Sequence, residues 1–214
     1  MTSSSDDDVA EEAYRFLRGD ELLGPVVEEY GKLGLDPSDD LFERLVISVL
    51  RQQVSMASAA ATRDRLFEAV DVTHEGILAV EEGILRDAGL SRQKARYVRE
   101  IAETFAEQGH TRESLADYGD EEIVERLTEI TGIGPWTARM QLLFTFGRPD
   151  VFPVGDLGVR KGMEALYGRE MTRAEMVEEA ERWAPYRSYA SLYLWRVNEA
   201  VDESVDEVTA ADPE

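Results

Sequence analysis

The sequence contains no cysteine and only two histidines, His74 and His110, among its 214 residues. The absence of cysteine excludes a disulfide scaffold, a thiol nucleophile, a cysteine-ligated zinc and an iron–sulfur cluster. Because the two histidines lie far apart and no H-E-x-x-H pattern occurs, metal sites and catalytic triads built on histidine are disfavoured. The function must therefore be sought in other residue types.

Long apolar runs are also missing. None approaches the roughly 20 residues that a helix needs to span a bilayer. Residues 1–8 have neither the basic region nor the apolar region of a signal peptide. Apolar residues still make up 43% of the chain, enough for one substantial domain or two small ones with a buried core. We therefore expect a folded cytoplasmic protein.

Lysine is scarce, and negative charge dominates. There are 23 basic and 45 acidic residues, a net charge of −22. Only Lys32, Lys94 and Lys161 are lysines, so the other 20 basic residues are arginines. Such a charge ordinarily argues against nucleic-acid binding. An acidic, lysine-poor composition is also typical of a halophilic protein, because the Debye length falls to about 3 Å at 1 M salt.

The pattern of apolar residues predicts an all-α fold of many short helices, since alternating valine-rich segments are lacking. A helix is expected to open at Asp36-Pro37 and continue through 41–50. A capping box at Thr172 to Glu175 predicts another over 173–183. We expect a helical domain over 9–204, flanked by disordered acidic tails at 1–8 and 205–214. Other helices are expected over 59–69, 80–88, 93–107, 111–114, 120–129 and 186–201.

The most informative segment is a glycine-containing hairpin over 127–140. One helix is expected to end at Thr131, and another to begin at Pro135 and run to Gly147. Gly132 and Gly134 would allow positive φ and a close approach by another backbone. The free N–H groups of a helix N-terminus can hold a phosphate without lysine, so local dipoles could bind DNA despite the net charge.

By itself such a turn could be a tight corner between two helices. The pattern L-x-x-I-x-G-I-G-x-x-T-A, however, resembles the helix–hairpin–helix motif of DNA-binding proteins. The resemblance implies that this segment contacts the DNA backbone, and that main-chain carbonyls hold a structural Na⁺ or K⁺ beside it. The implied DNA contacts are Gly132, Ile133, Gly134 and Thr137, and the implied cation ligands are Thr128, Ile130 and Ile133.

An aspartate follows the hairpin in a loop rich in glycine and proline, over 147–158. Asp156 lies 22 residues after Gly134 and, taken alone, is an N-cap for a helix beginning near Leu157. Hairpin, helix, loop and aspartate together resemble the helix–hairpin–helix (HhH-GPD) DNA glycosylase superfamily, in which that aspartate is catalytic. Both roles are compatible, because a helix N-terminus favours an ionised carboxylate. The resemblance implies two helical subdomains flanking a DNA-binding, active-site cleft.

Three further segments, 50–55, 88–95 and 181–196, are similar to the 3-methyladenine DNA glycosylase II branch, so the resemblance covers about 41–196. In bifunctional members a lysine nucleophile stands two residues after the second hairpin glycine. This chain has Trp136 there, so no amine is available for a Schiff base. The resemblance therefore implies a monofunctional enzyme that uses water and leaves an abasic site.

The same resemblance assigns roles to single residues. Gln53 would be the wedge that fills the gap left by a flipped base, although it could be an ordinary polar helix residue. Trp136 and Trp195 would form an aromatic pocket for a cationic base, although tryptophans are more often core residues. Asp156 would stabilise the oxocarbenium-like transition state and orient water. Arg160, Lys161 and Arg187 are candidates for positioning a phosphate or Asp156, and equally for structural ion pairs. Lys94 beside Ser91 could supply a second contact to the DNA backbone, whereas Tyr189 and Tyr193 are expected to be packing residues.

The sequence thus predicts a base-excision repair glycosylase that removes alkylated purines of the 3-methyladenine and 7-methylguanine type. Its expected partner is double-stranded DNA containing a damaged base; we expect a monomer, with no membrane association and no organic cofactor. Two alternatives stay open. One is a glycosylase for another damaged base, such as a deaminated or oxidised purine. The other is a non-catalytic helix–hairpin–helix DNA-binding module.

Overall fold

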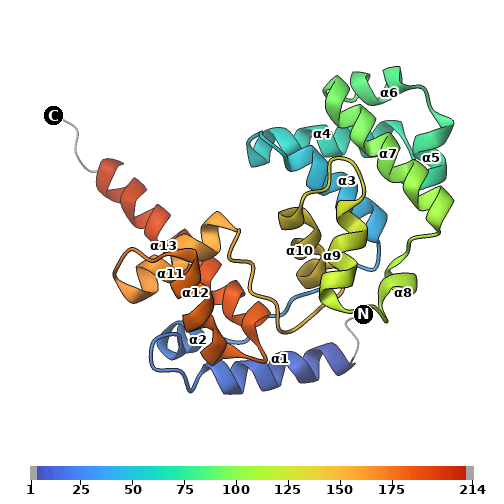
Figure 1. The fold of residues 1–214 in the computed structure, drawn as a ribbon. Coiled ribbons are helices and arrows are strands. Elements are labelled where there is room, and N and C mark those ends of the chain that lie inside the picture. The colour runs from blue at the N-terminus through green and yellow to red at the C-terminus, as the bar shows by residue number, and fades with distance from the viewer. Residues whose placement is uncertain (1–3, 211–214) are drawn as a thin grey trace. The chain divides into compact units, whose positions relative to one another are not determined.

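The computed structural model describes residues 4–210, with side chains described for 6–200, and every regular element in that range is a helix (Figure 1). The expected all-α class is confirmed. Within residues 4–210, no helix is both long enough and apolar enough to cross a bilayer.

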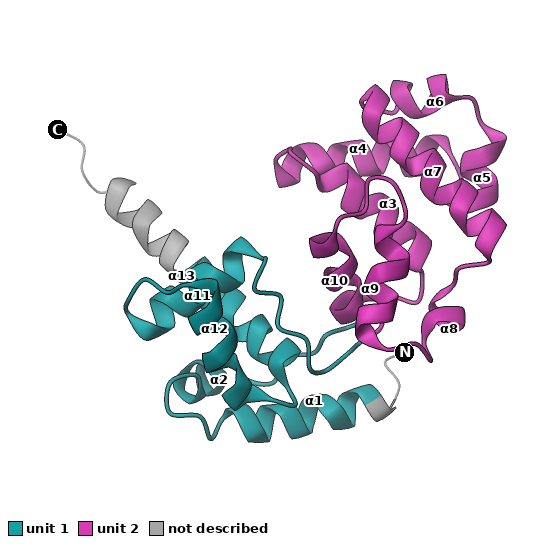
Figure 2. Ribbon diagram, viewed as in Figure 1, with its two compact units in different colours: residues 1–36, 147–214 teal, residues 37–146 magenta. Residues whose placement is uncertain are grey.

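The chain folds into two compact helical units (Figure 2). Unit 1 combines residues 1–36 with 147–214, and unit 2 is the continuous segment 37–146. The chain therefore leaves unit 1 before the hairpin and returns to it at the loop that contains Asp156. The expectation of two helical subdomains is confirmed, and the expected domain over 9–204 divides between them.

Unit 2 is built around α3 (Leu41–Arg51), which packs against α4, α7 and α10. Asp40 opens α3, because its side chain accepts a hydrogen bond from the Glu43 N–H at 2.8 Å. Leu45 and Val49, one turn apart on α3, are fully buried, which makes this face the core of the unit. The other helices are α4 (Met56–Ala69), α5 (His74–Ala79), α6 (Glu82–Asp87), α7 (Arg92–Gln108), α8 (Arg112–Leu115), α9 (Asp120–Thr128) and α10 (Pro135–Phe144).

Unit 1 is built around the packing of α11 (Leu157–Tyr167) along α13 (Arg187–Ala210). The two helices approach closely because Gly162 has no side chain: a Cβ there would overlap the carbonyl oxygen of Leu194. Trp183 and Tyr193 are fully buried in this unit. Its remaining elements are α1 (Ser4–Leu17), α2 (Gly24–Tyr30), α12 (Arg173–Ala180) and the 3-10 helix η1 (Glu181–Trp183).

The ends of the chain differ from expectation. Helix α1 begins at Ser4, so the expected disordered tail over 1–8 is wrong for residues 4–8. Asp7 lies in the first turn, where the helix dipole favours a carboxylate, and it pairs with Lys32 at 2.7 Å. Helix α13 ends at Ala210, within the tail expected over 205–214. Residues 1–3 and 211–214 lie outside the described residues.

Candidate functional site

The hairpin of unit 2 joins α9 to α10. Helix α9 ends at Thr128, three residues before the expected position, and α10 begins at Pro135 as expected. Gly134 is the N-cap of α10, with φ −91° and ψ 169°. The N–H groups of Trp136 and Thr137 lie in the first turn of α10, where N–H groups have no partner within the helix. The positive end of the α10 dipole and these donors together favour an anion.

The two hairpin glycines serve different purposes. Gly132 has φ +94°, and a Cβ there would lie 2.5 Å from Cγ of Tyr97, so the fold itself requires glycine at this position. Gly134 has a negative φ, and a Cβ there would meet nothing within 4 Å. The expectation that Gly134 supplies a positive φ is therefore wrong. Its open side leaves room for a ligand to approach the start of α10.

Thr137 does not present its side chain to solvent. Only 5% of this residue is exposed, so a DNA contact from Thr137 can come from its backbone N–H but not from its hydroxyl. One turn later, the buried Gln141 side chain donates to Ser48 Oγ at 3.3 Å and accepts from Thr145 Oγ1 at 2.9 Å. The bond to Ser48 anchors α10 to α3, while the bond from Thr145 lies at the end of α10 itself, and the hairpin is thereby held on the core of unit 2.

Gln53, the expected wedge, lies directly after α3 and is exposed. Its backbone is left-handed, with φ +56°, which is uncommon for a residue other than glycine and is typical of functional sites. Two hydrogen bonds hold the segment around it. Gln52 Nε2 donates to the Gly132 carbonyl at 2.9 Å, and Lys94 Nζ donates to the Leu50 carbonyl at 2.7 Å. Gln53 is therefore held beside the hairpin by the residues that precede it.

The hairpin and Gln53 share a depression of about 600 Å³. Lys94 is the one charged side chain that lines it, and burial lowers the pKa of this lysine. No acidic residue lines it, although the chain has 45 of them, so this surface can accept an anion. The lining residues are Leu50, Gln52, Gln53, Val54, Ser58, Thr62, Gly89, Ser91, Gln93, Lys94, Tyr97, Gly132, Ile133 and Gly134.

Basic residues continue beyond this depression. Arg86, Arg92 and Arg96 line a neighbouring one with Glu82, and Gln93 lines both. Ser91 begins α7 by accepting a hydrogen bond from the Lys94 N–H at 3.2 Å. The expectation of a second DNA contact at Ser91 and Lys94 is supported by their place in the hairpin depression, and it stays a prediction.

Trp136, the expected stacking residue of unit 2, is 49% exposed on the first turn of α10. A tryptophan is usually more buried than this, because its large apolar surface is costly to leave in water. The exposed ring beside the hairpin is therefore available to an aromatic ligand.

The backbone carbonyls expected to bind a monovalent cation belong to the end of α9 and to the turn that follows it. The Ile130 carbonyl accepts a hydrogen bond from the Ile133 N–H at 3.0 Å, and its second lone pair can still bind a cation. Neutral main-chain oxygens suit Na⁺ or K⁺, so the donor set at Thr128, Ile130 and Ile133 fits the expected ion. Within the described residues, no cluster of three or more histidine, aspartate or glutamate side chains is arranged to hold a metal.

In unit 1, Asp156 is the N-cap of α11, as the sequence predicts. Its Oδ1 accepts a hydrogen bond from the Val159 N–H at 3.0 Å. The same oxygen accepts a second hydrogen bond, at 2.8 Å, from Nε1 of Trp195 on α13. Asp156 is partly exposed, and the next residue, Leu157, is 56% exposed. The carboxylate is thus held from two directions at the surface of unit 1.

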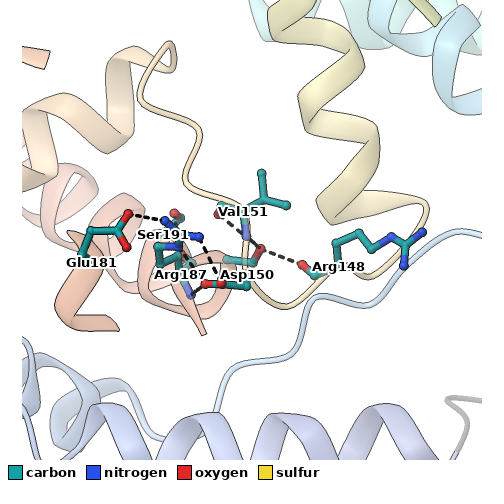
Figure 3. A network of polar contacts seen from close by, with 7 residues as sticks. Arg148, Asp150, Val151, Glu181, Arg187 and Ser191 are labelled. Carbon is teal, nitrogen blue, oxygen red and sulfur yellow. Dashed lines mark hydrogen bonds and ion pairs between the residues drawn. The ribbon is translucent and has the colours of Figure 1, made fainter. Parts of the chain in front are cut away.

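The loop before Asp156 is fastened to the start of α13 (Figure 3). Arg187 forms a two-pronged ion pair with Asp150, at 2.8 and 3.0 Å, and a third contact of 2.6 Å with Glu181. The Asp150 carboxylate raises the pKa of Arg187. Ser188 Oγ donates to the Arg148 carbonyl at 2.6 Å and accepts from the Val151 N–H at 2.9 Å. Arg187 therefore has a structural role, because it holds this loop against the start of α13.

Sequence reasoning did not identify Asp150 and Ser188, because a single aspartate or serine in a loop has no distinctive spacing. Tyr189 and Tyr193 are 4% and 1% exposed, which confirms that they are packing residues. Burial raises the pKa of Tyr189 to about 12. Arg160 and Lys161 lie in the first turns of α11, and their expected roles stay open.

The structure places the expected site residues in two groups. Gln53, the hairpin and Trp136 belong to unit 2, whereas Asp156 and Trp195 belong to unit 1.

Comparison with known proteins identifies the family to which the chain is similar. The sequence profile described as "HhH-GPD superfamily base excision DNA repair protein" matches residues 46–186. DNA-3-methyladenine glycosylase 1 of Schizosaccharomyces pombe is 34% identical over 169 residues, which are 75% of this chain and 74% of that protein. A DNA-3-methyladenine glycosylase of Bacillus subtilis is 30% identical over 199 residues, 86% of this chain and 66% of that protein.

Among solved structures, a 3-methyladenine DNA glycosylase of Schizosaccharomyces pombe in complex with abasic DNA superposes with a TM-score of 0.77. The two chains are 31% identical, and the match covers 86% of this chain and 95% of the other. The chain spans slightly less than two thirds of the length of two Bacillus subtilis relatives, 64% and 66%.

Proposed function

The chain belongs to the HhH-GPD superfamily of base excision DNA repair proteins, and from this membership we propose that it is a DNA glycosylase. Its substrate would be double-stranded DNA containing alkylated purines of the 3-methyladenine and 7-methylguanine type. The observation that carries this proposal is the Asp156 carboxylate, fixed at the N-terminus of α11 by two hydrogen bonds to one oxygen. The hairpin in unit 2 supplies the means to hold DNA.

DNA binding would begin at the hairpin. The N–H groups at the start of α10 bind a phosphate of the backbone, and the open side of Gly134 admits it closely. A Na⁺ or K⁺ held by the carbonyls of Thr128, Ile130 and Ile133 would add positive charge between hairpin and phosphate. The protein would bind DNA as a monomer.

The damaged base must leave the duplex before it can react. Gln53 would fill the gap in the base stack, because its backbone is fixed beside the hairpin and its side chain is exposed. The exposed Trp136 ring would stack on the extruded base. A cationic purine over the face of a tryptophan gains about 0.5–2 kcal/mol, so this ring favours alkylated over normal bases.

The chemistry would be hydrolysis of the N-glycosidic bond. In a 3- or 7-alkylated purine the base already carries positive charge, so the bonding electron pair leaves with the base and neutralises it. The sugar develops the positive charge of an oxocarbenium ion. The Asp156 carboxylate would stabilise that charge, and would accept a proton from the water that adds to C1′. The products are the free base and an abasic site.

No covalent enzyme intermediate is expected. Trp136 stands where bifunctional relatives need an amine, and an indole cannot form a Schiff base. Borohydride treatment during the reaction should therefore trap no protein–DNA adduct. The number of strand breaks should not exceed the number that arises from spontaneous cleavage at abasic sites. A trapped adduct would contradict the monofunctional assignment.

Release of free bases from methylated DNA tests the proposal. Incubation with DNA treated with a methylating agent should release 3-methyladenine and 7-methylguanine, identified by chromatography. Release of a deaminated or oxidised purine from suitably damaged DNA, without the methylated bases, would assign another lesion. Binding to damaged DNA with no release of any base would identify a non-catalytic module.

A further inference from the structure

Trp195 donates a hydrogen bond from the edge of its indole ring to the carboxylate of Asp156. We infer that Trp195 is a positioning residue for Asp156, acting through its indole N–H on Oδ1. The Trp195 Nε1–Asp156 Oδ1 distance is 2.8 Å, a short hydrogen bond for a nitrogen donor. This role differs from the stacking role implied by the family resemblance, since stacking uses the face of the ring. The inference of a catalytic consequence rests on the proposed function.

The two hydrogen bonds on Asp156 define how the carboxylate is oriented. Both donors, the Val159 N–H and the Trp195 Nε1–H, bind Oδ1. The backbone donor alone would leave the carboxylate able to rotate about the Cβ–Cγ bond. A second donor from α13 restricts this rotation, and with both donors on Oδ1 the other oxygen, Oδ2, is the one that can face the reacting sugar and water. The indole N–H suits this task, because it donates only and stays protonated at every pH at which the protein is folded.

The fold makes space for this contact. A Cβ at position 158 would lie 2.7 Å from Cδ1 and 3.1 Å from Nε1 of Trp195, so any side chain there would push the indole away. One turn later, Gly162 allows the α11 backbone to approach Leu194, the residue before Trp195. Gly158 and Gly162 thus lie on the face of α11 that receives α13. The close approach of the two helices brings the indole N–H of Trp195, on α13, to the carboxylate of Asp156 at the N-terminus of α11.

Two substitutions test the inference by different routes. Trp195→Phe keeps an aromatic face but removes the donor. Gly158→Ala keeps the donor but crowds the hydrogen bond itself, because its Cβ would lie 2.7 Å from Cδ1 of Trp195 and 3.2 Å from Oδ1 of Asp156, while alanine otherwise favours the helix. We expect each to lower the single-turnover rate of 7-methylguanine release by roughly 10-fold or more, as the loss of a hydrogen bond to a charged group requires. The affinity for lesion-containing DNA should change by less than about 3-fold, since the groups that hold DNA are intact.

Matched controls separate positioning from general damage. Tyr193→Phe removes another buried aromatic donor of α13, whose hydroxyl donates to the Gly31 carbonyl at 2.9 Å, and should lower stability without lowering the excision rate of the folded enzyme. Gly83→Ala adds a methyl group to α6, where a Cβ meets nothing within 4 Å. This substitution should change neither the stability nor the excision rate.

A double-mutant cycle shows whether Trp195 acts through Asp156. In an Asp156→Asn background, Trp195→Phe should lower the residual rate by less than about 3-fold, because the carboxylate it positions is already gone. Equal losses in both backgrounds would mean that Trp195 acts independently of Asp156, and would overturn the inference. A loss of DNA affinity that matches the loss of rate would do the same.

The hydrogen bond can also be tested without activity. The indole ¹H–¹⁵N resonance of Trp195 is identified by its absence in Trp195→Phe. In Asp156→Ala it should move upfield, toward the position of an unbonded indole, while the resonances of Trp136 and Trp183 stay in place. An unmoved resonance would overturn the inference. If the wild-type protein released no base but this resonance moved, the proposed function would fail while the positioning of Asp156 stood.

Discussion

At the scale of single residues, one glycine of the hairpin is required for folding and the other is available for binding. Gly132 is required by the packing of Tyr97 and by a φ of +94°. Gly134 has neither constraint, so the fold would accept a side chain at this position. A glycine that the fold does not need, at the N-cap of a helix, is explained by a ligand that approaches the backbone closely.

Substitution of the two glycines should therefore affect different properties, thermal stability at Gly132 and DNA affinity at Gly134. Gly132→Ala should lower the melting temperature, because its methyl group would lie 2.5 Å from the Tyr97 ring in a strained conformation. Gly134→Val should leave the melting temperature nearly unchanged, while DNA affinity falls by roughly 10-fold or more as the side chain blocks a phosphate hydrogen bond. Calorimetry and fluorescence anisotropy measure the two quantities. Normal DNA affinity of folded Gly134→Val would remove the hairpin from the interface.

Some residue roles could be predicted from sequence, and others could not. Asp156 was predictable as a helix cap, because a capping residue is defined by its neighbours along the chain. The burial of the Thr137 side chain was not predictable, since it depends on how α10 lies on α3. The same holds for the bond between Trp195 and Asp156. The two residues lie 39 positions apart, and they meet only because two glycines let α11 approach α13.

At the scale of elements, the loop before α11 is ordered by side chains that belong to the start of α13. Asp150 and Arg187 form two parallel hydrogen bonds, a geometry that lysine cannot reproduce. Ser188 adds bonds to the backbone on both sides of Asp150. These contacts fix the path of the chain as it approaches Asp156.

Arg187→Lys should weaken this attachment. We expect a loss of roughly 1–3 kcal/mol in the free energy of unfolding, because the hydrogen bonds to a partly buried carboxylate are lost while the charge stays. The excision rate should also fall, as the loop that carries Asp156 becomes more mobile. Arg169→Lys is the matched control: its pair with Glu175 is exposed and should contribute at most about 1 kcal/mol. Equal effects of the two substitutions, measured by urea denaturation and single-turnover kinetics, would contradict a special role for Arg187.

Helix positions were more predictable than helix ends. The apolar spacing through Leu41 to Leu50 correctly predicted α3, but the expected start at Asp36-Pro37 was wrong. Asp40 caps the helix instead, and Asp36 has φ +46°. Several residues near a helix start can accept a hydrogen bond from the first turn, and the packing of the preceding chain selects among them.

At the scale of the whole molecule, the chain carries a net charge of −22 but still has a surface at which an anion can bind. The hairpin depression has no acidic lining residue, and the adjoining one contributes Arg86, Arg92 and Arg96. Binding at the hairpin itself uses backbone dipoles, which add no net charge. The acidic remainder of the surface is compatible with concentrated salt, which screens its self-repulsion. The halophilic character expected from composition stays a prediction.

DNA binding should therefore depend weakly on salt. If Lys94 and the three arginines all contact phosphates, four counterion sites give a slope of log K against log salt no steeper than about −4. Titrations of lesion-containing DNA between low and high potassium chloride measure this slope, and base release should persist at the high end. A slope of about −6 or steeper would contradict both the backbone-centred mode of binding and the high-salt interpretation of the charge.

The most direct measurement is the single-turnover rate of 7-methylguanine release by Asp156→Asn, compared with the wild type at equal occupancy of lesion DNA. The asparagine oxygen can still cap α11, so folding and lesion binding should be retained. Loss of the negative charge at the transition state should lower the rate by about 100-fold or more. A rate close to that of the wild type would mean that Asp156 is only a helix cap, and would contradict the proposed mechanism.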